Sequence, residues 1–306
     1  MGDTTINIDA FCEACVKQVV QPLIFITVMV STYRHLFYSL KIDKNEPKAI
    51  LADLNNYYYH NRKAKMKFGR PQEQNGEIKY RDLYPSIHEL KTIQKKINVF
   101  LQKIQLPDYV YGSVKGRNNI MNAEVHFGNK YFLLVDLKNY FTKISHHQVF
   151  DTFLYFGFSH DVARMLTQLT TYNGCLPQGA PTSPVIANLV FVKTGLKLFD
   201  KAQLNNLTFT TYLDDLTFSS RNDFKELIPE ILQEIKSNRF FLNYNKIRYR
   251  KDFAEVTGVL LSPKGMTVES DMQERSKESR ATKNYTDRVK ASGQAALKKL
   301  NSQRSR

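Results

Sequence analysis

The spacing of apolar side chains along the chain predicts two amphipathic helices. In each, apolar positions recur every three or four residues and leave polar positions on the other face. The first helix is preceded by Ser86 and Glu89, which have the spacing of a capping box. Its apolar stripe consists of Leu90, Ile93, Ile97, Phe100, Leu101 and Ile104. The stripe of the second helix consists of Phe224, Leu227, Ile228, Ile231, Leu232 and Ile235.

Other segments have the composition of strands. Residues 131–135 form a continuous apolar run ending at Asp136, which predicts a strand buried on both faces. Residues 207–211 and 216–220 are rich in β-branched and aromatic side chains, so they predict a hairpin with Asp214 and Asp215 at its tip. With the apolar, helix-like stretch 185–199, the order from residue 131 onward is βαββαβ. This order indicates a ferredoxin-like sheet in an α+β fold.

The candidate chemical groups are the carboxylates of Asp136, Asp214 and Asp215. A ferredoxin-like sheet would bring Asp136 and the hairpin tip together on adjacent strands. Hard cations such as Mg²⁺ prefer oxygen ligands, and two such ions can activate an attacking oxygen and stabilise a leaving one in phosphoryl transfer. An isolated Asp-Asp pair is more often a solvated turn, so this interpretation depends on the rest of the chain.

The loop between the two acidic sites supplies the next element. Residues 176–184 read Leu-Pro-Gln-Gly-Ala-Pro-Thr-Ser-Pro, and a glycine-bearing loop before a helix offers backbone N–H groups to phosphate. An acid at a strand end, a Pro-Gln-Gly loop and then Tyr212-Leu-Asp-Asp215, in this order, resembles the reverse transcriptases. The resemblance covers about residues 79–265 and implies a right-hand polymerase with fingers, a ferredoxin-like palm and a thumb.

The resemblance also implies a role for each matched residue. Asp136, Asp214 and Asp215 correspond to the catalytic aspartates, which would bind two Mg²⁺ ions together with the carbonyl of Leu137. The residues implied to contact an incoming deoxynucleoside triphosphate (dNTP) are Arg81, Phe141, Gln178, Gly179 and Lys246. Phe141 matches the gate that excludes a ribose 2′-OH. Lys79 competes with Arg81 for its role, and Lys246 is nearly as compatible with a surface lysine.

Two short segments narrow the resemblance to the bacterial retron reverse transcriptases. Asn122-Ala-Glu-Val-His126 resembles that group's Asn-Ala-X-X-His signature, and Val256-Thr257-Gly258 resembles its Val-Thr-Gly signature. The candidate RNA-binding residues are therefore Asn122, His126, Val256, Thr257 and Gly258. His126 is also compatible with a core histidine, and Val-Thr-Gly with any strand end.

A retron enzyme implies a particular substrate and set of partners. The resemblance implies synthesis on a structured noncoding RNA, primed from a 2′-OH within it, giving a branched RNA–DNA hybrid (msDNA). It also implies an effector or toxin protein encoded nearby and a role in defence against phage. Two alternatives remain open: another bacterial reverse transcriptase, of the group II intron or abortive-infection kind, and a non-catalytic RNA-binding scaffold.

Four regions are expected: a mostly helical N-terminal region (1–70), fingers (71–130), a palm (131–262) and a reduced basic thumb or tail (263–306). The tail is polar and has few large apolar side chains. It is expected either to form a basic helix that orders on RNA or to stay disordered. The basic loop 112–117 suits template phosphates or a simple turn.

Charge and cysteine content restrict the partners and the compartment. The chain has 44 Lys and Arg against 29 Asp and Glu, a net charge of +15 that attracts polyanions. The longest apolar stretch, residues 23–30, is too short to span a bilayer, so no membrane association is expected. Cys12 and Cys15 form a single Cys-X-X-Cys without a second pair, and the 3 cysteines imply no disulfide framework. A cytoplasmic location is expected.

Overall fold

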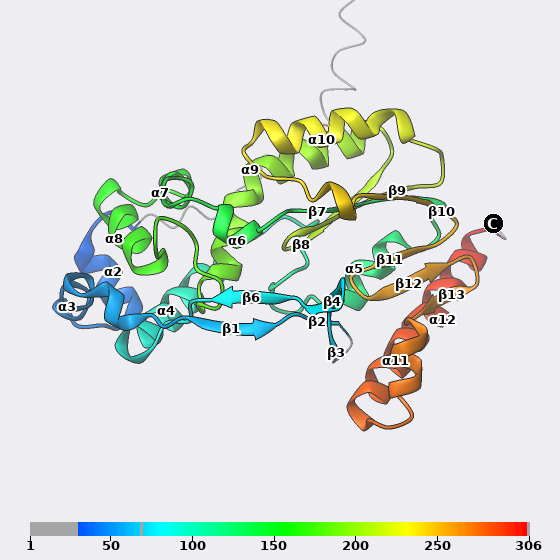
Figure 1. The fold of residues 1–306 in the computed structure, drawn as a ribbon. Coiled ribbons are helices and arrows are strands. Elements are labelled where there is room, and N and C mark those ends of the chain that lie inside the picture. Colours follow the sequence, from blue (N-terminus) through cyan, green and yellow to red (C-terminus); the bar gives the residue numbers. More distant parts are fainter. Residues whose placement is uncertain (1–29, 68–69, 305–306) are drawn as a thin grey trace, which may run out of the picture.

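The computed structural model describes residues 30–67 and 70–304 (Figure 1). The paired cysteines and the apolar stretch before Val30 lie outside the described residues. Helices and strands both contribute, which confirms the α+β class. The helices not described below are α2 (Tyr33–Leu40), α3 (Glu46–Ala52), η2 (Leu54–Tyr57), α6 (Tyr140–Lys143), α7 (His146–Tyr155), α8 (His160–Thr170), η3 (Lys225–Leu227), η4 (Tyr244–Lys246) and α11 (Ser270–Arg275).

A four-stranded antiparallel sheet lies at the centre of the molecule. Its strands are β7 (Tyr131–Asp136), β8 (Thr208–Tyr212), β9 (Asp215–Ser220) and β10 (Arg248–Lys251), in the spatial order β10-β7-β9-β8. Helices α9 (Ser183–Leu204) and α10 (Ile228–Ser237) cover one face (Figure 1). The apolar run 131–135 is a strand with a partner on each side, because its side chains are buried among both layers.

A smaller layer covers part of the other face of this sheet. It consists of α5 (Asn119–His126) and a three-stranded sheet of β11 (Ala254–Val256), β12 (Val259–Ser262) and β13 (Gly265–Thr267). Phe132 of β7 packs with Ile120, Val256 and Val259 in a second core. The predicted turn between Ser262 and Gly265 is confirmed.

A long hairpin lies across the molecule from the central sheet (Figure 1). Its main strands are β1 (Asn61–Ala64) and β6 (Tyr80–Leu83), and its tip contains β2 (Met66–Lys67), β3 (Arg70–Pro71), β4 (Glu73–Gln74) and β5 (Glu77–Ile78). The predicted boundary between residues 70 and 71 is wrong, because it cuts β3 inside this hairpin. The boundary at 262/263 is also wrong, since β12 and β13 pair across it.

The first amphipathic helix is confirmed, but its predicted cap is not. Helix α4 (His88–Leu101) buries the predicted stripe from Leu90 to Leu101. It begins after Ile87 without a side-chain cap. Ser86 is buried and donates a 2.6 Å hydrogen bond to Gln94 Oε1, so its hydroxyl satisfies a core amide rather than the end of the helix.

The basic tail is an ordered helix, α12 (Arg280–Arg304), packed beside β13. Val289 and Ala296 are buried on its inner side. A Cβ on Gly293 would lie 2.7 Å from the backbone nitrogen of Met266, so glycine permits the close crossing of helix and strand. The prediction of a disordered tail is therefore wrong, and α12 forms without RNA because a few small apolar residues suffice to dock it.

Candidate active site

The central sheet brings the predicted aspartates together. Asp136 ends β7 and pairs across the sheet with Asp215, the first residue of β9. The backbone N–H of Leu137 donates a 2.9 Å hydrogen bond to the carbonyl oxygen of Asp214. The βαββαβ order predicted this meeting, although about 80 residues separate the two strands.

A neighbouring segment, residues 109–112, supports the hairpin tip from below. Thr211 N donates to Tyr109 O (2.7 Å), and Tyr111 N donates to Thr211 O (2.8 Å). A Cβ on Gly112 would lie 2.6 Å from the backbone nitrogen of Leu213, which itself has a φ of 57°. Such a left-handed conformation is costly for a bulky residue and persists where its surroundings enforce it. Sequence reasoning missed Gly112, and its only signal was a glycine opening a basic loop.

That basic loop has a structural role in the described chain. Arg117 Nη1 donates hydrogen bonds to the carbonyl oxygens of Pro107 (2.9 Å) and Asp108 (3.0 Å). Its Nη2 pairs with the Asp108 carboxylate at 2.8 Å. Arg117 therefore fixes the segment that leads into residues 109–112, and it does not contribute a free cation for template phosphates.

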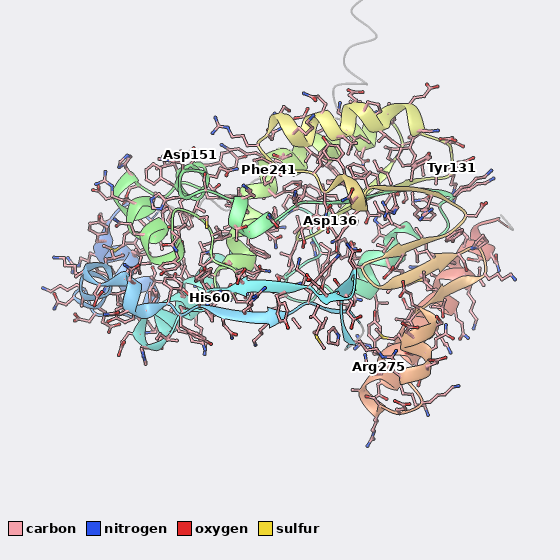
Figure 2. The ribbon with its side chains drawn as sticks, in the orientation of Figure 1. His60, Tyr131, Asp136, Asp151, Phe241 and Arg275 are labelled. Carbon is pink, nitrogen blue, oxygen red and sulfur yellow. The ribbon has the colours of Figure 1, made fainter. Side chains whose placement is uncertain are left out.

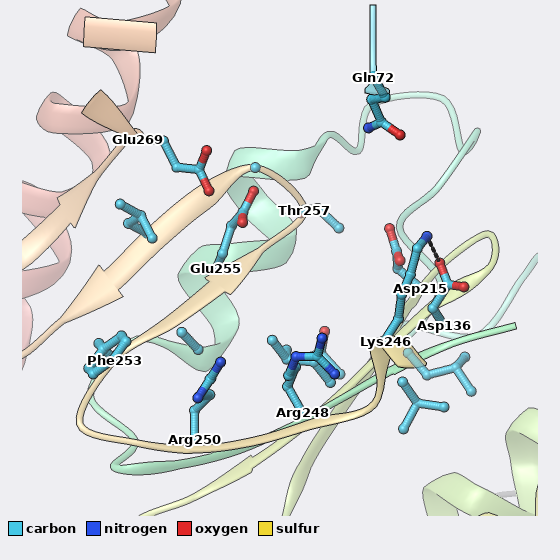
Figure 3. Close-up of a pocket in the computed structure, with 17 residues that line it drawn as sticks. Gln72, Asp136, Asp215, Lys246, Arg248, Arg250, Phe253, Glu255, Thr257 and Glu269 are labelled. Carbon is cyan, nitrogen blue, oxygen red and sulfur yellow. Dashed lines mark hydrogen bonds and ion pairs between the residues drawn. The ribbon is translucent and has the colours of Figure 1, made fainter. Parts of the chain in front are cut away.

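Both carboxylate oxygens of Asp136 accept hydrogen bonds from one short turn. Lys246 Nζ lies 2.7 Å from Oδ2, and Asn243 Nδ2 lies 2.7 Å from Oδ1 (Figure 3). The backbone N–H of Asn243 also donates to the Asp136 carbonyl oxygen at 2.9 Å. The turn that ends in η4 therefore holds the carboxylate in one orientation and places a cation beside it.

The three carboxylates perturb one another. Burial, followed by the nearby Asp136 carboxylate, raises the pKa of Asp214 above its ordinary value. Burial and then the charges of Asp214 and Asp136 raise the pKa of Asp215 to about 7, although Asp215 keeps contact with solvent. Lys246 opposes both shifts. The site thus concentrates negative charge that a further cation would relieve.

The donor set fits a hard divalent cation in its chemistry. Carboxylate oxygens and a backbone carbonyl are the ligands that Mg²⁺ prefers. Among residues 30–67 and 70–304, however, no three acidic, histidine or cysteine side chains converge closely enough to hold a metal ion as they stand. Lys246 occupies one of the required oxygens, so binding of a metal by Asp136 requires this lysine to move.

Two clefts meet at Asp136, which lies near the centre of the molecule (Figure 2). The β6-side cleft, of about 750 Å³, is lined by Lys79, Arg81, Phe141, Gln178 and Lys246, so the predicted dNTP contacts except Gly179 share one space. Gly179 has a φ of 107° and lies behind this wall against Leu83 and Pro85. Both Lys79 and Arg81 reach the cleft, so the choice between them stays open.

The β10-side cleft, of about 740 Å³, extends from the aspartates in the other direction (Figure 3). Asp136, Asp215 and Lys246 stand at one end of it, and Arg248, Arg250 and Phe253 line one side. The β11–β12 turn contributes Thr257 and Gly258 to the opposite side. Gln72, from the tip of the long hairpin, lines both clefts.

Most of the candidate RNA-binding side chains are buried, which corrects their predicted role. Asn122, His126 and Val256 are each no more than 1% exposed, so they do not present a surface to RNA. The ring nitrogens of His126 lie 2.7 Å from the hydroxyls of Ser219 and Thr210, and burial lowers its pKa to about 3. His126 is thus the core histidine that the sequence had left as an alternative.

The two signature segments contact each other. Asn122 Nδ2 donates to Thr257 Oγ1 at 3.3 Å, and Asn119 Nδ2 donates to the Thr257 carbonyl at 3.0 Å. Thr257 and Gly258 have φ values of 48° and 83° in the two-residue turn between β11 and β12. Positive φ at both positions is the requirement of a type I′ turn, which explains the glycine. Only Thr257 and Gly258 keep surface in a cleft.

Comparison with known proteins identifies the family. The reverse transcriptase (RNA-dependent DNA polymerase) family matches residues 73–261, more than half of the chain and all of the site described above. The chain belongs to the reverse transcriptase family. The right-hand polymerase fold follows from this membership, and the central sheet carries the family's aspartates at the end of β7 and at the β8–β9 tip.

Several curated members of the reverse transcriptase family are similar to this chain. The Retron Se72 reverse transcriptase of Salmonella heidelberg (strain 579083-10) is 32% identical over 66% of this chain and 55% of its own length. The Retron Ec86 reverse transcriptase of Escherichia coli is 30% identical over 61% of this chain and 60% of its own. The Retron Mx65 reverse transcriptase of Myxococcus xanthus is 27% identical over 59% and 48%. The chain thus spans roughly half to three fifths of these relatives.

Hydropathy of the helices bears on membrane association. Within the described ranges, no helix combines the length and the apolar character needed to cross a bilayer.

Proposed function

We propose that this chain is an RNA-directed DNA polymerase that uses dNTPs. The observation that carries the proposal is the meeting of Asp136, Asp214 and Asp215 where two clefts join, on a sheet of the matching family. Arg81 and Lys246 supply positive charge to the same cleft as Phe141 and Gln178. That combination suits a triphosphate on one side and a flat base and sugar on the other.

The proposed roles follow from these positions. Asp136, Asp214 and the Leu137 carbonyl would hold two Mg²⁺ ions, with Asp215 supporting the site. When bound, such ions lower the pKa of an attacking hydroxyl and neutralise the charge that develops on a leaving pyrophosphate. Gln178 would orient the nucleotide, and Phe141 would reject a ribose because its ring fills the space beside the sugar. Lys246, once released from Asp136, would be free to pair with the triphosphate.

Replacing one acid tests the chemistry. Asp214→Asn removes a charged ligand with little change in volume, and extension of a DNA primer annealed to an RNA template should fall by several orders of magnitude. Asp252→Asn is the matched control, since Asp252 is exposed and its φ of 67° suits asparagine. Ordinary extension rates in Asp214→Asn, measured beside this control, would contradict the assignment.

We propose further that the chain acts as a retron reverse transcriptase. The similar retron enzymes and the contact between the two signature segments support this over a group II intron or abortive-infection enzyme. The template would be a structured noncoding RNA, the primer a 2′-OH within it, and the product branched msDNA. An effector protein encoded nearby would act with it against phage, in the cytoplasm.

The retron part has its own test. The RNA encoded beside the gene should yield DNA that stays attached to RNA after heating and is released by an enzyme that cleaves 2′–5′ branches. The intact chain should synthesise this product without an added primer. DNA made only from an added 3′-OH primer would leave the polymerase assignment standing and remove the retron one.

A further inference from the structure

The β10-side cleft contains a basic strand that the proposed chemistry does not use. Arg248 and Arg250 alternate along β10, so they project from one face of that strand and lie about 6.6 Å apart along it. Both are exposed and line the cleft. The row begins at Lys246 beside Asp136 and ends at Phe253, at the far end of the cleft (Figure 3).

These side chains have few partners inside the protein. Among the described residues, Arg250 makes no hydrogen bond or ion pair, and Arg248 donates only to the adjacent Ile247 carbonyl, at 2.9 Å. Phe253 is 59% exposed. Two cations at the spacing of successive phosphates, followed by an exposed ring, are the elements with which proteins hold single-stranded nucleic acid: charge tracks the backbone and the aromatic stacks on a base.

The opposite side of the cleft distinguishes RNA from DNA. Glu255 on β11 and Glu269 line it, together with the Thr257 turn. Carboxylates only accept hydrogen bonds when ionised, and they repel phosphate. A ribose 2′-OH donates a hydrogen bond, whereas deoxyribose has no such group. A strand with phosphates toward β10 and sugar edges toward β11 therefore fits this cleft as RNA and not as DNA.

We infer that the β10-side cleft binds a single strand of RNA, with its phosphates on Arg248 and Arg250 and a base on Phe253. The inference rests on the proposed function for its choice of reaction: a strand primed at an internal 2′-OH continues as RNA beyond the priming nucleotide. That continuing strand needs a path away from the aspartates, separate from the path of the new DNA. The β10-side cleft supplies such a path.

A fluorescent reporter can locate the strand, because the chain contains no tryptophan (Trp 0). Phe253→Trp puts one indole at the end of the cleft, and Phe241→Trp is the matched reporter at another exposed phenylalanine (51% exposed). The probes are a 12-nucleotide oligouridylate and the corresponding oligodeoxyuridylate. The RNA should quench the Phe253→Trp protein, and half-quenching should need about fivefold more of the DNA. The Phe241→Trp protein should respond much less.

Two neighbouring residues of β10 test the charge. In the Phe253→Trp background, Arg250→Ala should raise the half-quenching concentration of RNA about tenfold and lower the salt slope by about 0.7, the value of one phosphate contact on a single strand. Lys251→Ala removes the same charge from the other face of β10 and should shift it less than about twofold. Equal effects of the two substitutions, equal quenching by DNA, or equal quenching of both reporters would overturn the inference.

Failure of this inference can be told apart from failure of the proposed function. Primer extension on an annealed RNA template measures polymerase activity without a free RNA strand, and Lys251→Ala should leave it unchanged. A chain that extends the primer but shows no quenching at Phe253→Trp retains the proposed function and loses the RNA path. A chain that quenches but never extends does the reverse.

Discussion

Asp136 accepts hydrogen bonds on both carboxylate oxygens, and one donor is the cation of Lys246. The lysine thus occupies the position of a metal ion in charge, and the two compete for the same oxygen. Such a contact keeps the acid ionised and oriented before a metal arrives. Release of the lysine would then deliver a positive charge to the β6-side cleft at the time when a triphosphate enters it.

Removing the lysine should therefore tighten metal binding. The Lys246 side chain is 63% exposed and that of Asp136 12%, so the ion pair contributes about 1 kcal/mol. Lys246→Gln should lower the dissociation constant for Mn²⁺, measured by the loss of its free paramagnetic signal, by about fivefold. Lys143→Gln, outside both clefts, is the control. Weaker Mn²⁺ binding in Lys246→Gln would mean that the lysine instead prepares Asp136 for the metal.

His126 gives the folded chain a predictable response to acid. Its pKa is lowered from 6.5 to about 3 by burial, so the folded state binds fewer protons than the unfolded state between these values. The free energy of unfolding is unaffected above about pH 6.5 and falls as the pH drops below it, by about 2 kcal/mol from this residue between pH 7 and 5.

Urea unfolding at the two pH values measures this contribution. His126→Gln should be less stable at pH 7, because two buried hydroxyls lose an ideal partner, but its stability should change about 2 kcal/mol less on acidification. His160→Gln replaces an exposed histidine and should keep the response of the original chain. The same acid response in both variants would show that His126 does not cause it.

The catalytic hairpin depends on a segment that is not a strand of the main sheet. Residues 109–112 pair with Thr211 and press against Leu213, and Asn188 of α9 donates a 2.7 Å hydrogen bond to the Gly112 carbonyl. The tip is therefore held between β9, α9 and this segment. A shift of the segment would move Asp214 relative to Asp136.

Gly112→Ala should produce such a shift. Its Cβ would meet backbone, which cannot rotate away, and a displacement of about 1 Å at catalytic groups costs about 100-fold in rate. Gly116→Ala is the control: its Cβ meets nothing within 4 Å, but its φ of 82° makes alanine strained. Primer extension should fall in Gly112→Ala at an unchanged melting temperature. A loss of rate in proportion to lost stability in both variants would contradict the positioning role.

The elements differ in how far their residues predicted them. Runs with a single period, such as Tyr131–Val135 and the stripe from Leu90 to Leu101, predicted their strand and helix because burial of one face decides the structure. The meeting of Asp136 with Asp215 followed from the order of elements. The contacts of Gly112, Arg117 and Asn122 did not, because each depends on a partner distant in sequence. Burial of His126 needed the same information.

The molecule as a whole presents its excess positive charge on separate surfaces. Helix α12 packs through Val289 and Ala296 and leaves Lys283, Lys290 and Lys298 exposed. Helix α4 also exposes lysines, on another side of the molecule. Structured RNA is bound through its backbone and shape, so these two faces are alternatives for recognition of the cognate RNA. Deleting α12 would not separate them, since it would also expose the second core.

Charge removal on the two faces distinguishes them. Replacing Lys283, Lys290 and Lys298 with Gln should weaken binding of the cognate RNA and reduce the salt slope of the affinity by about 2 to 3, as three lost phosphate contacts require. Replacing Lys91, Lys95 and Lys103 of α4 with Gln removes the same charge and should leave the slope unchanged. A larger effect of the α4 substitutions would place recognition on that helix.

The strand order β10-β7-β9-β8 has a consequence for synthesis of the protein. β7 is the first strand of this sheet to leave the ribosome, yet both of its neighbours are made later, and β9 begins about 80 residues downstream. At a translation rate of about 5–20 residues per second, the apolar strand waits about 4 to 16 s with both edges unpaired. Such an edge pairs readily with other chains. The position of Asp136 at the centre of the sheet therefore makes the nascent chain dependent on protection from aggregation, and slower translation across residues 137–214 should lower the yield of soluble enzyme.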